Sequence, residues 1–280
     1  MSHVKYINLL TSLIENSHFM PNSSPHTDRN FDPIAEHFAK KVYGGLKGDI
    51  RLAVLRQDIF EWVTNQNRPL RILDIGAGLA QISIDLASRG HEITVNDISL
   101  EMLKKAQSLA NENQAHLGEK IIWHACPYQD LGDKLTGKYD LILCHAVLEW
   151  LGEPQKVMGF FDTWLVTQGA VSLCFYNPAS FVYRNLIMGN FNLLNKTDFK
   201  ADDKSLTPNH PVAKEAVFDW LKNHHYCVVT TSGLRVFHDY SPLKRGGHTN
   251  PQAVIEMEVQ DSRQEPYKWL GRYLHILAEK

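Results

Sequence analysis

The chain has 280 residues, 44% of them hydrophobic, and a formal net charge of −2 at pH 7. This size suits one large domain, or one domain with a cap. The near-neutral balance excludes a global cationic field for nucleic acid, although it leaves room for a local basic patch. No apolar run approaches the ~20 residues of a membrane span, so we expect no membrane partner.

The cysteines indicate neither a disulfide framework nor a metal site. The four of them are far apart and form no Cys-x-x-Cys pair. Three fall in apolar runs that resemble strands, where a buried reduced thiol is expected, and this favours the cytosol. The four cysteines are Cys126, Cys144, Cys174 and Cys227.

The N-terminal part is predicted to be an arm followed by two helices. Residues 1–27 are assigned no function. From Asp28, apolar residues at helical spacing predict a helix that stops at Gly44–Gly45, and a second helix follows Gly48. These helices would cover a ligand cleft. Arg51 in the second helix could bind a ligand carboxylate through its planar guanidinium, or it could be a solvated arginine on a helix face.

A glycine turn follows the first predicted strand. Residues 71–75 form a short apolar run with Asp74 near its end, and a helix begins near Ala80. Gly76 and Gly78 permit positive φ and a close approach of ligand to backbone. A strand, a glycine turn and a helix form the nucleotide-binding corner of a doubly wound sheet.

The acids beside this turn indicate which nucleotide binds. A dinucleotide fingerprint expects Gly or Ala where Gln81 stands, and a P-loop expects a lysine that is missing. Asp97 ends the next strand and suits ribose hydroxyls, while Asp74 suits a cationic group. A cationic ligand with a ribose and no phosphate is S-adenosylmethionine. The alternative is a glycine turn that only connects a strand to a helix.

The next elements continue the alternation of strands and helices. Ser99 is predicted to cap a helix that runs to about Gln114. Tyr128 and Gln129 follow the third strand and could contact an adenine. His145 ends the fourth strand, at the edge where open α/β sheets bind ligands, although a structural histidine is equally compatible. The strands are predicted over residues 120–125, 139–144 and 169–176.

An unusual segment, residues 177–210, then interrupts the alternation. Its interleaved aromatic and basic residues suit a cap that contributes to the substrate site through phosphate contacts and base stacking. Nearby aspartates offset its lysines, so an ordinary surface insertion is an equal alternative. The remaining predictions are a helix over 211–224, a strand from 226 that continues in β style to 240, a helix over 251–263 and a terminal strand over 272–279.

These elements predict an α/β fold: a doubly wound, seven-stranded, Rossmann-like sheet of the class I methyltransferase type, with N-terminal helices and an inserted cap. The predicted methyltransferase domain spans residues 28–280. From Asp28 onward the chain resembles the bacterial tRNA 5-carboxymethoxyuridine methyltransferases. The segments that carry the resemblance are Asp28–Asp32, Tyr43–Gly44, Lys47–Gly48, Arg51, Cys144–Trp150, Phe175–Asn177, Gly189–Phe191, Arg235–Tyr240, Arg263–Tyr267 and Leu270–His275.

The resemblance implies a cytosolic enzyme that uses S-adenosylmethionine to esterify the carboxylate of 5-carboxymethoxyuridine, at the wobble position of the tRNA anticodon stem-loop. The sequence departs from the family where Ala77 and Ala80 replace glycines and Tyr128 replaces a small residue. The family's S-adenosylmethionine contacts fall on Arg51, Gly76, Ala77, Asp97, Tyr128, Gln129 and His145, to which the glycine-turn argument adds Asp74 and Gly78.

The implied acceptor needs no general base, because a carboxylic acid with an ordinary pKa near ~4 is already ionised at neutral pH. Catalysis should then consist of positioning and partial desolvation, with no catalytic acid or base and no metal. The acceptor carboxylate needs donors, and Arg184 and Arg235 could equally bind phosphates. The candidate donors are Tyr176, Arg184, Arg235 and His238.

Three other functions remain open at this point. One is a methyltransferase for a small acid or a quinone, and another is a non-catalytic module that binds S-adenosylmethionine and RNA. A pyridine-nucleotide oxidoreductase is a more distant third, because of Gln81. The sequence does not decide the oligomeric state.

Overall fold

The computed structural model describes residues 44–195, 208, 211–241 and 250–280. The predicted arm, the first predicted helix and most of the second half of the insertion lie outside these residues. Within the described part of the chain, no helix is long and apolar enough to cross a membrane.

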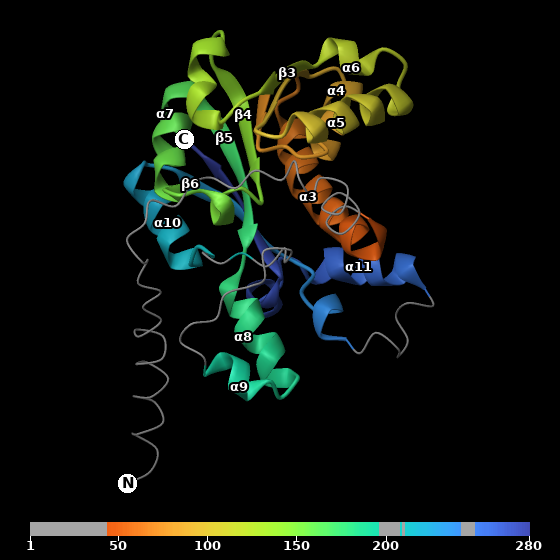
Figure 1. The fold of residues 1–280 in the computed structure, drawn as a ribbon, viewed down its shortest axis with the longest axis vertical. Coiled ribbons are helices and arrows are strands. Elements are labelled where there is room, and N and C mark those ends of the chain that lie inside the picture. The colour runs from red at the N-terminus through yellow and green to blue at the C-terminus, as the bar shows by residue number, and fades with distance from the viewer. Residues whose placement is uncertain (1–43, 196–207, 209–210, 242–249) are drawn as a thin grey trace.

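One seven-stranded sheet forms the centre of the molecule, in the order β3-β2-β1-β4-β5-β7-β6 (Figure 1). The pairs among β1 to β5 are parallel, and β7 runs antiparallel to both of its neighbours, β5 and β6. The strands are β1 Arg71–Ile75, β2 Glu92–Asp97, β3 Ile122–Ala125, β4 Tyr139–His145, β5 Leu165–Tyr176, β6 Cys227–Leu234 and β7 Tyr273–Glu279.

Helices cover both faces of the sheet, with α3, α4 and α5 on one side and α7 and α10 on the other (Figure 1). The short helices α8 and α9 lie beyond the end of β5. The helices are α3 Gly45–Asn65, α4 Gln81–Ser88, α5 Leu100–Asn113, α6 Leu117–Lys120, α7 Val157–Trp164, α8 Pro178–Ile187, α9 Phe191–Leu194, α10 Lys214–Asn223 and α11 Pro251–Asp261.

The central strands are apolar on both faces because helices bury both sides of a parallel sheet. Alternate residues therefore enter different cores. In β1, Ile72 packs into the cluster under α3 to α5, whereas Leu73 and Ile75 pack into the cluster under α7 and α10. In β4, Leu141 and Ile142 divide in the same way. This packing fixes the register of the strands. It therefore also fixes the direction in which the side chains at the end of each strand point.

The site is positioned by the order of the strands. The chain passes from β1 outward through β2 and β3 and then returns to β4, which pairs with β1. Ligands of open α/β sheets bind at such a reversal, outside the carboxyl ends of the strands. The amino end of antiparallel β7 reaches this same edge, so residues from several strands meet there.

Most of the predicted elements that lie within the described residues are confirmed, with small shifts of their ends. Ser99 caps α5, since its hydroxyl accepts a hydrogen bond from the Met102 N–H at 3.1 Å. The predicted helix after Gly48 begins earlier, at Gly45, where we expected the preceding helix to stop. Strand β5 begins at Leu165, four residues before the predicted start.

One prediction is wrong, because the chain does not continue as a strand to residue 240. Strand β6 ends at Leu234, Arg235 takes φ +61°, and a 3₁₀ helix follows over His238–Tyr240. The cause is the buried carboxylate of Glu258 in α11. It accepts hydrogen bonds from the N–H groups of three successive residues, 236 to 238, and these groups are then not available to a strand partner.

Candidate active site

The glycine turn after β1 is closely packed against the loop that follows β4. Gly76 has φ +61° and Gly78 has φ +57°. A Cβ built on Gly76 would lie 2.5 Å from the Val147 side chain. A side chain is therefore excluded by both the backbone conformation and the packing. Ala80, predicted to start the helix, instead takes φ +51° just before α4.

Asp97 fastens this turn to the end of β2. One of its carboxylate oxygens accepts a hydrogen bond from the Gly78 N–H at 2.8 Å, and the other accepts one from the Ser99 N–H at 2.8 Å. The residue is only 8% exposed. Its position relative to the turn is thus fixed by two backbone groups.

Asp74 lies beneath the same turn and is almost fully buried. One oxygen accepts a hydrogen bond from the Ser83 hydroxyl at 2.6 Å, and the other has no hydrogen-bond partner among the described residues. Burial raises the pKa of Asp74 to about 7, the Ser83 hydrogen bond opposes this rise, and the charge of Asp97 adds to it.

These contacts disfavour a phosphate at the turn. In a phosphate cradle the N–H groups of the turn point at the anion, whereas here the Gly78 N–H donates to Asp97. Two buried carboxyl groups also lie next to the turn, and they favour a positively charged ligand group over a negative one. The site fits a cationic nucleoside.

The two adenine candidates after β3 differ in exposure. Tyr128 is 8% exposed, and its ring packs edge-to-face on Phe160 of α7 at 5.5 Å between centroids. Gln129 is exposed beside it. This placement commits most of the Tyr128 ring to the core.

Three arginines gather around two tyrosine rings at the same edge of the sheet. Arg51, 6% exposed, lies over the Tyr273 ring at 5.1 Å, and Arg235 lies over the same ring at 5.5 Å. Arg272 lies over the Tyr176 ring at 4.8 Å. We call Arg51, Arg235, Arg272, Tyr176 and Tyr273 the arginine–tyrosine cluster. The burial of Arg51 rules out a solvated arginine on a helix face.

Two acids touch this cluster. Asp239 lies 3.4 Å from Arg235 and 3.9 Å from Arg272. Glu149 is 3% exposed, and one of its oxygens has no hydrogen-bond partner among the described residues. The same is true of the Tyr176 hydroxyl. Three guanidinium groups face two carboxyl groups, so the cluster retains positive charge and an unpaired donor, as an anion site requires.

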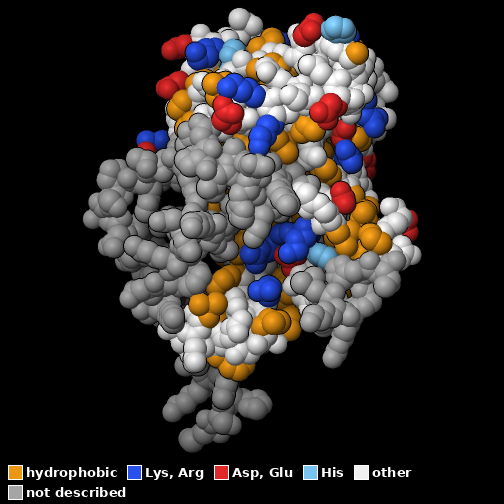
Figure 2. Space-filling view, turned by 45° about the vertical axis from the view of Figure 1, so that its right-hand side comes forward, with side chains coloured by type: hydrophobic (Ala, Val, Ile, Leu, Met, Phe, Trp, Pro, Cys, Tyr) orange, Lys and Arg blue, Asp and Glu red, His pale blue; other side chains and the backbone are white. Residues whose placement is uncertain are grey.

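Figure 2 shows Lys and Arg side chains gathered in the middle of one face, with acidic and histidine side chains beside them. The predicted acceptor residues do not all belong to the arginine–tyrosine cluster. Tyr176 and Arg235 belong to the cluster, whereas Arg184 is exposed on α8 and His238 is buried at 4% exposure. Sequence reasoning missed Glu149, Arg272 and Tyr273 as site residues, although each lies in a segment that carries the family resemblance.

Glu149 provides a test of the electrostatics of the cluster. Burial raises its pKa from 4.5 to about 7, against the opposing charge of Arg51. A carboxyl group whose pKa is raised in the folded state makes its full contribution to the stability of the protein below pH 4.5. This contribution is lost as the pH rises through 7. We expect Glu149→Gln to remove this loss. Urea unfolding should show the variant gaining on the order of 3 kcal/mol over wild type between pH 4.5 and pH 8.

Exposed Glu153→Gln is the matched control and should gain nothing over this pH range. A Glu149→Gln variant with the same pH dependence of stability as wild type would contradict the assignment of a raised pKa to Glu149.

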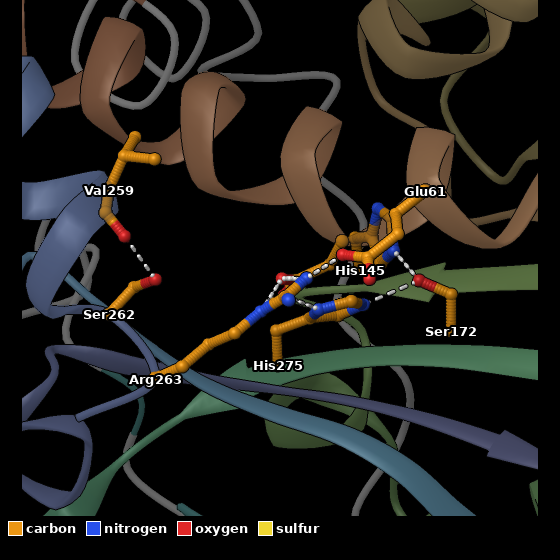
Figure 3. A network of polar contacts seen from close by, with 8 residues as sticks. Glu61, His145, Ser172, Val259, Ser262, Arg263 and His275 are labelled. Carbon is orange, nitrogen blue, oxygen red and sulfur yellow. Dashed lines mark hydrogen bonds and ion pairs between the residues drawn. The ribbon is translucent and has the colours of Figure 1, made fainter. Parts of the chain in front are cut away.

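His145, at the end of β4, joins a buried polar network. Its Nε2 lies 2.8 Å from the Ser172 hydroxyl, which lies 2.7 Å from Nε2 of His275 (Figure 3). Burial holds the pKa of His145 well below its usual value, and the nearby positive charge of Arg51 adds to this effect. The ring is therefore neutral at physiological pH.

Comparisons with known proteins agree with this geometry. A family model described as a methyltransferase domain matches residues 73–173. The chain is 36% identical over 254 residues to the tRNA 5-carboxymethoxyuridine methyltransferase of Escherichia coli (strain K12), covering 90% of this chain and 97% of that one. It is 29% identical over 128 residues to the ubiquinone biosynthesis O-methyltransferase of Bordetella avium (strain 197N), covering 44% and 52%.

Solved structures support the fold. The magnesium protoporphyrin IX methyltransferase ChlM from Synechocystis PCC 6803, with SAH bound, has a TM-score of 0.56 at 18% identity, covering 89% of this chain and 95% of that one. The [4+2]-cyclase SpnF has a TM-score of 0.54 at 14% identity, covering 92% and 99%. Since the fold serves different reactions, only the nearly full-length sequence match decides the family. The chain belongs to the family of tRNA 5-carboxymethoxyuridine methyltransferases.

Proposed function

We propose that this protein transfers a methyl group from S-adenosylmethionine to the carboxylate of 5-carboxymethoxyuridine in the anticodon stem-loop of tRNA, in the cytoplasm, forming the methyl ester. The observation that carries the proposal is a pair of oppositely charged subsites at one edge of the sheet. The glycine turn with its two acids suits a cation, and the arginine–tyrosine cluster suits an anion. The 36%-identical relative bears the matching name.

The first subsite holds the donor, which supplies a methyl group on a cationic sulfonium. Asp97 binds the ribose hydroxyls. A carboxylate has about four lone-pair positions, so Asp97 can accept from these hydroxyls while it still accepts from two backbone N–H groups. Gly76, Ala77 and Gly78 let the ligand approach the backbone. Asp74 lies beneath them and favours a positive charge.

Four further residues complete the donor site in this proposal. In this proposal Arg51 reaches the ligand from α3 and His145 reaches it from the end of β4. Tyr128 and Gln129 follow β3 and lie next to the base of the nucleoside. Because the ring of Tyr128 is packed on Phe160, Gln129 is the residue of this pair that is exposed.

The second subsite holds the acceptor carboxylate. Arg235 and Arg272 each approach it with a guanidinium, and the Tyr176 hydroxyl is a third donor without a hydrogen-bond partner among the described residues. Asp239 lies close to both arginines and offsets part of their positive charge. The acceptor carboxylate, which is the nucleophile, is therefore not fully neutralised by them. Since the carboxylate is already ionised, the residues orient it and exclude water, and none of them accepts a proton.

The insertion forms the contact surface for RNA in this proposal. Helix α8 exposes Tyr183 and Arg184, Met188 just after it is exposed, and helix α9 exposes Phe191. Aromatic faces stack on unpaired bases, and an arginine can bind the adjacent phosphate. With a net charge of −2, binding would depend on such local contacts and not on a long-range field. We therefore assign residues 177–210 to the substrate site of a methyltransferase domain over 28–280.

The test is methyl transfer from labelled S-adenosylmethionine to bulk tRNA from cells that lack this protein, followed by nucleoside analysis. We expect a new, base-labile methyl ester on 5-carboxymethoxyuridine. tRNA from cells that contain the protein is the control and should accept little label. Binding of S-adenosylmethionine without transfer to tRNA would overturn the proposal and favour a small-acid or quinone substrate, or a module that only binds.

A further inference from the structure

A continuous row of four polar side chains joins helix α3 to His145 through the interior of the protein. Asp58 of α3, His275 of β7 and Ser172 of β5 are each 0–1% exposed. The Asp58 carboxylate lies 2.6 Å from Nδ1 of His275, Ser172 lies 2.7 Å from Nε2 of His275, and His145 lies 2.8 Å from Ser172. Figure 3 shows the Ser172 hydroxyl between the two imidazole rings.

The Asp58 end of the row is ionised. Burial alone would raise the pKa of Asp58, but hydrogen bonds from His275 and Arg263 outweigh burial and lower it. Arg263 donates from Nε and Nη2 to one oxygen of Asp58, at 2.9 and 2.7 Å. An ionised carboxylate only accepts hydrogen bonds, so Nδ1 of His275 must donate to Asp58.

The remaining hydrogens follow from this first one. In a neutral His275 ring with hydrogen on Nδ1, Nε2 is an acceptor, and the Ser172 hydroxyl donates to it. The Ser172 oxygen then accepts from Nε2–H of His145. A neutral His145 with hydrogen on Nε2 has its lone pair on Nδ1. Whether the second ring nitrogen of a histidine carries a hydrogen is thus set by the hydrogen bond that the first ring nitrogen makes.

We infer that Asp58, His275 and Ser172 are positioning residues that hold His145 as the Nε2–H tautomer and present its Nδ1 as a hydrogen-bond acceptor to the donor ligand. The acceptor role rests on the proposed function, because ammonium, hydroxyl and amine groups are the hydrogen-bond donors of S-adenosylmethionine. The tautomer itself does not rest on it. A neutral accepting ring beside the glycine turn avoids repulsion of the cationic sulfonium.

Asp58→Asn tests the row with almost no change in shape. Arg263 still needs an acceptor, so the amide oxygen stays toward Arg263 and the amide nitrogen turns to His275. That nitrogen donates to Nδ1, which moves the hydrogen of His275 to Nε2. His275 then donates to Ser172, Ser172 donates to His145, and the hydrogen of His145 moves to Nδ1.

The tautomer is read directly by long-range ¹H–¹⁵N correlation NMR of ligand-free protein at pH 8, with the His145 signals assigned by their loss in His145→Gln. We expect hydrogen on Nε2 in the wild type and on Nδ1 in Asp58→Asn. A wild-type ring with hydrogen on Nδ1, or a His145 that does not respond to Asp58→Asn, would overturn the inference. Neither outcome depends on methyl transfer.

Ser172→Ala is the matched control and a second, milder variant. It removes the hydroxyl that joins His275 to His145, while Asp58, His275 and His145 stay in place. His145 should then show both tautomers. In the Ser172→Ala background, Asp58→Asn should no longer change the ratio of the His145 tautomers. A change of the same size as in the wild-type background would show that the effect does not travel through this row, and would overturn the inference.

The ligand contact is tested by kinetics. We expect Asp58→Asn to raise KM for S-adenosylmethionine about tenfold, the effect of one hydrogen bond, with kcat on tRNA within about twofold of wild type. A switched tautomer with unchanged KM would overturn the acceptor role of Nδ1. Failure of the wild-type protein to methylate tRNA would refute the proposed function and leave the NMR result standing.

Discussion

Asp97→Ala is expected to lower kcat/KM for S-adenosylmethionine by about 10²–10³-fold. The variant loses charge-assisted hydrogen bonds to the ribose, each contributing about 1.5–3 kcal/mol, and every 1.4 kcal/mol is a factor of ten. It also leaves the N–H groups of Gly78 and Ser99 without their acceptor, so the glycine turn is no longer held to β2. Isothermal titration with S-adenosylmethionine measures the loss at the binding step.

Two variants separate the roles of Asp97. Asp97→Asn keeps one acceptor oxygen and the shape of the side chain, so we expect an intermediate loss of about tenfold. Asp130→Ala removes an exposed carboxylate after β3 and should bind S-adenosylmethionine as wild type does. Binding by folded Asp97→Ala within threefold of wild type would contradict the placement of the ribose at Asp97.

Arg272→Met and Arg235→Met should each lower kcat/KM for tRNA by about 10–100-fold while the Kd for S-adenosylmethionine changes little. A guanidinium–carboxylate contact in a desolvated site contributes about 1.5–3 kcal/mol, and methionine keeps most of the apolar bulk over the tyrosine ring. Steady-state kinetics with undermethylated tRNA, alongside titration with S-adenosylmethionine, distinguish the two effects.

The control for these variants is Arg89→Met. Arg89 also lies over an aromatic ring, that of Phe60, at 4.2 Å, but it follows α4 at the opposite edge of the sheet. We expect this variant to act as wild type on tRNA. Equal losses in Arg89→Met and Arg272→Met would indicate that general surface charge, and not the arginine–tyrosine cluster, governs activity.

The sequence predicted those features that depend on neighbouring residues. The apolar runs of β1, β2 and β4, the Ser99 cap and the glycine turn each follow from a few consecutive side chains, and all are confirmed. The end of β6 was mispredicted, because the side chain of Glu258 accepts hydrogen bonds from the N–H groups of residues 236 to 238, which lie 20 to 22 positions before it in the sequence. No local pattern reveals such a contact.

The composition of the site was predicted in part for the same reason. Asp97 ends β2 and Asp74 is the next-to-last residue of the adjacent parallel strand β1, so their proximity follows from the alternation of strands and helices. Arg272 and Tyr273 reach the site only because β7 runs antiparallel between β5 and β6, with Tyr273 opposite Tyr176. That pairing joins residues about 100 positions apart, and the sequence does not reveal it until the order of the strands is known.

The position of β7 has a consequence for the synthesis of the protein. Strand β7 comes last of the seven in the chain yet lies inside the sheet, so the ribosome releases β1 to β4 well before the strand that carries Tyr273. Non-local pairings of this kind form late. A growing chain therefore completes the glycine turn first, and gains the arginine–tyrosine cluster only as translation nears its end.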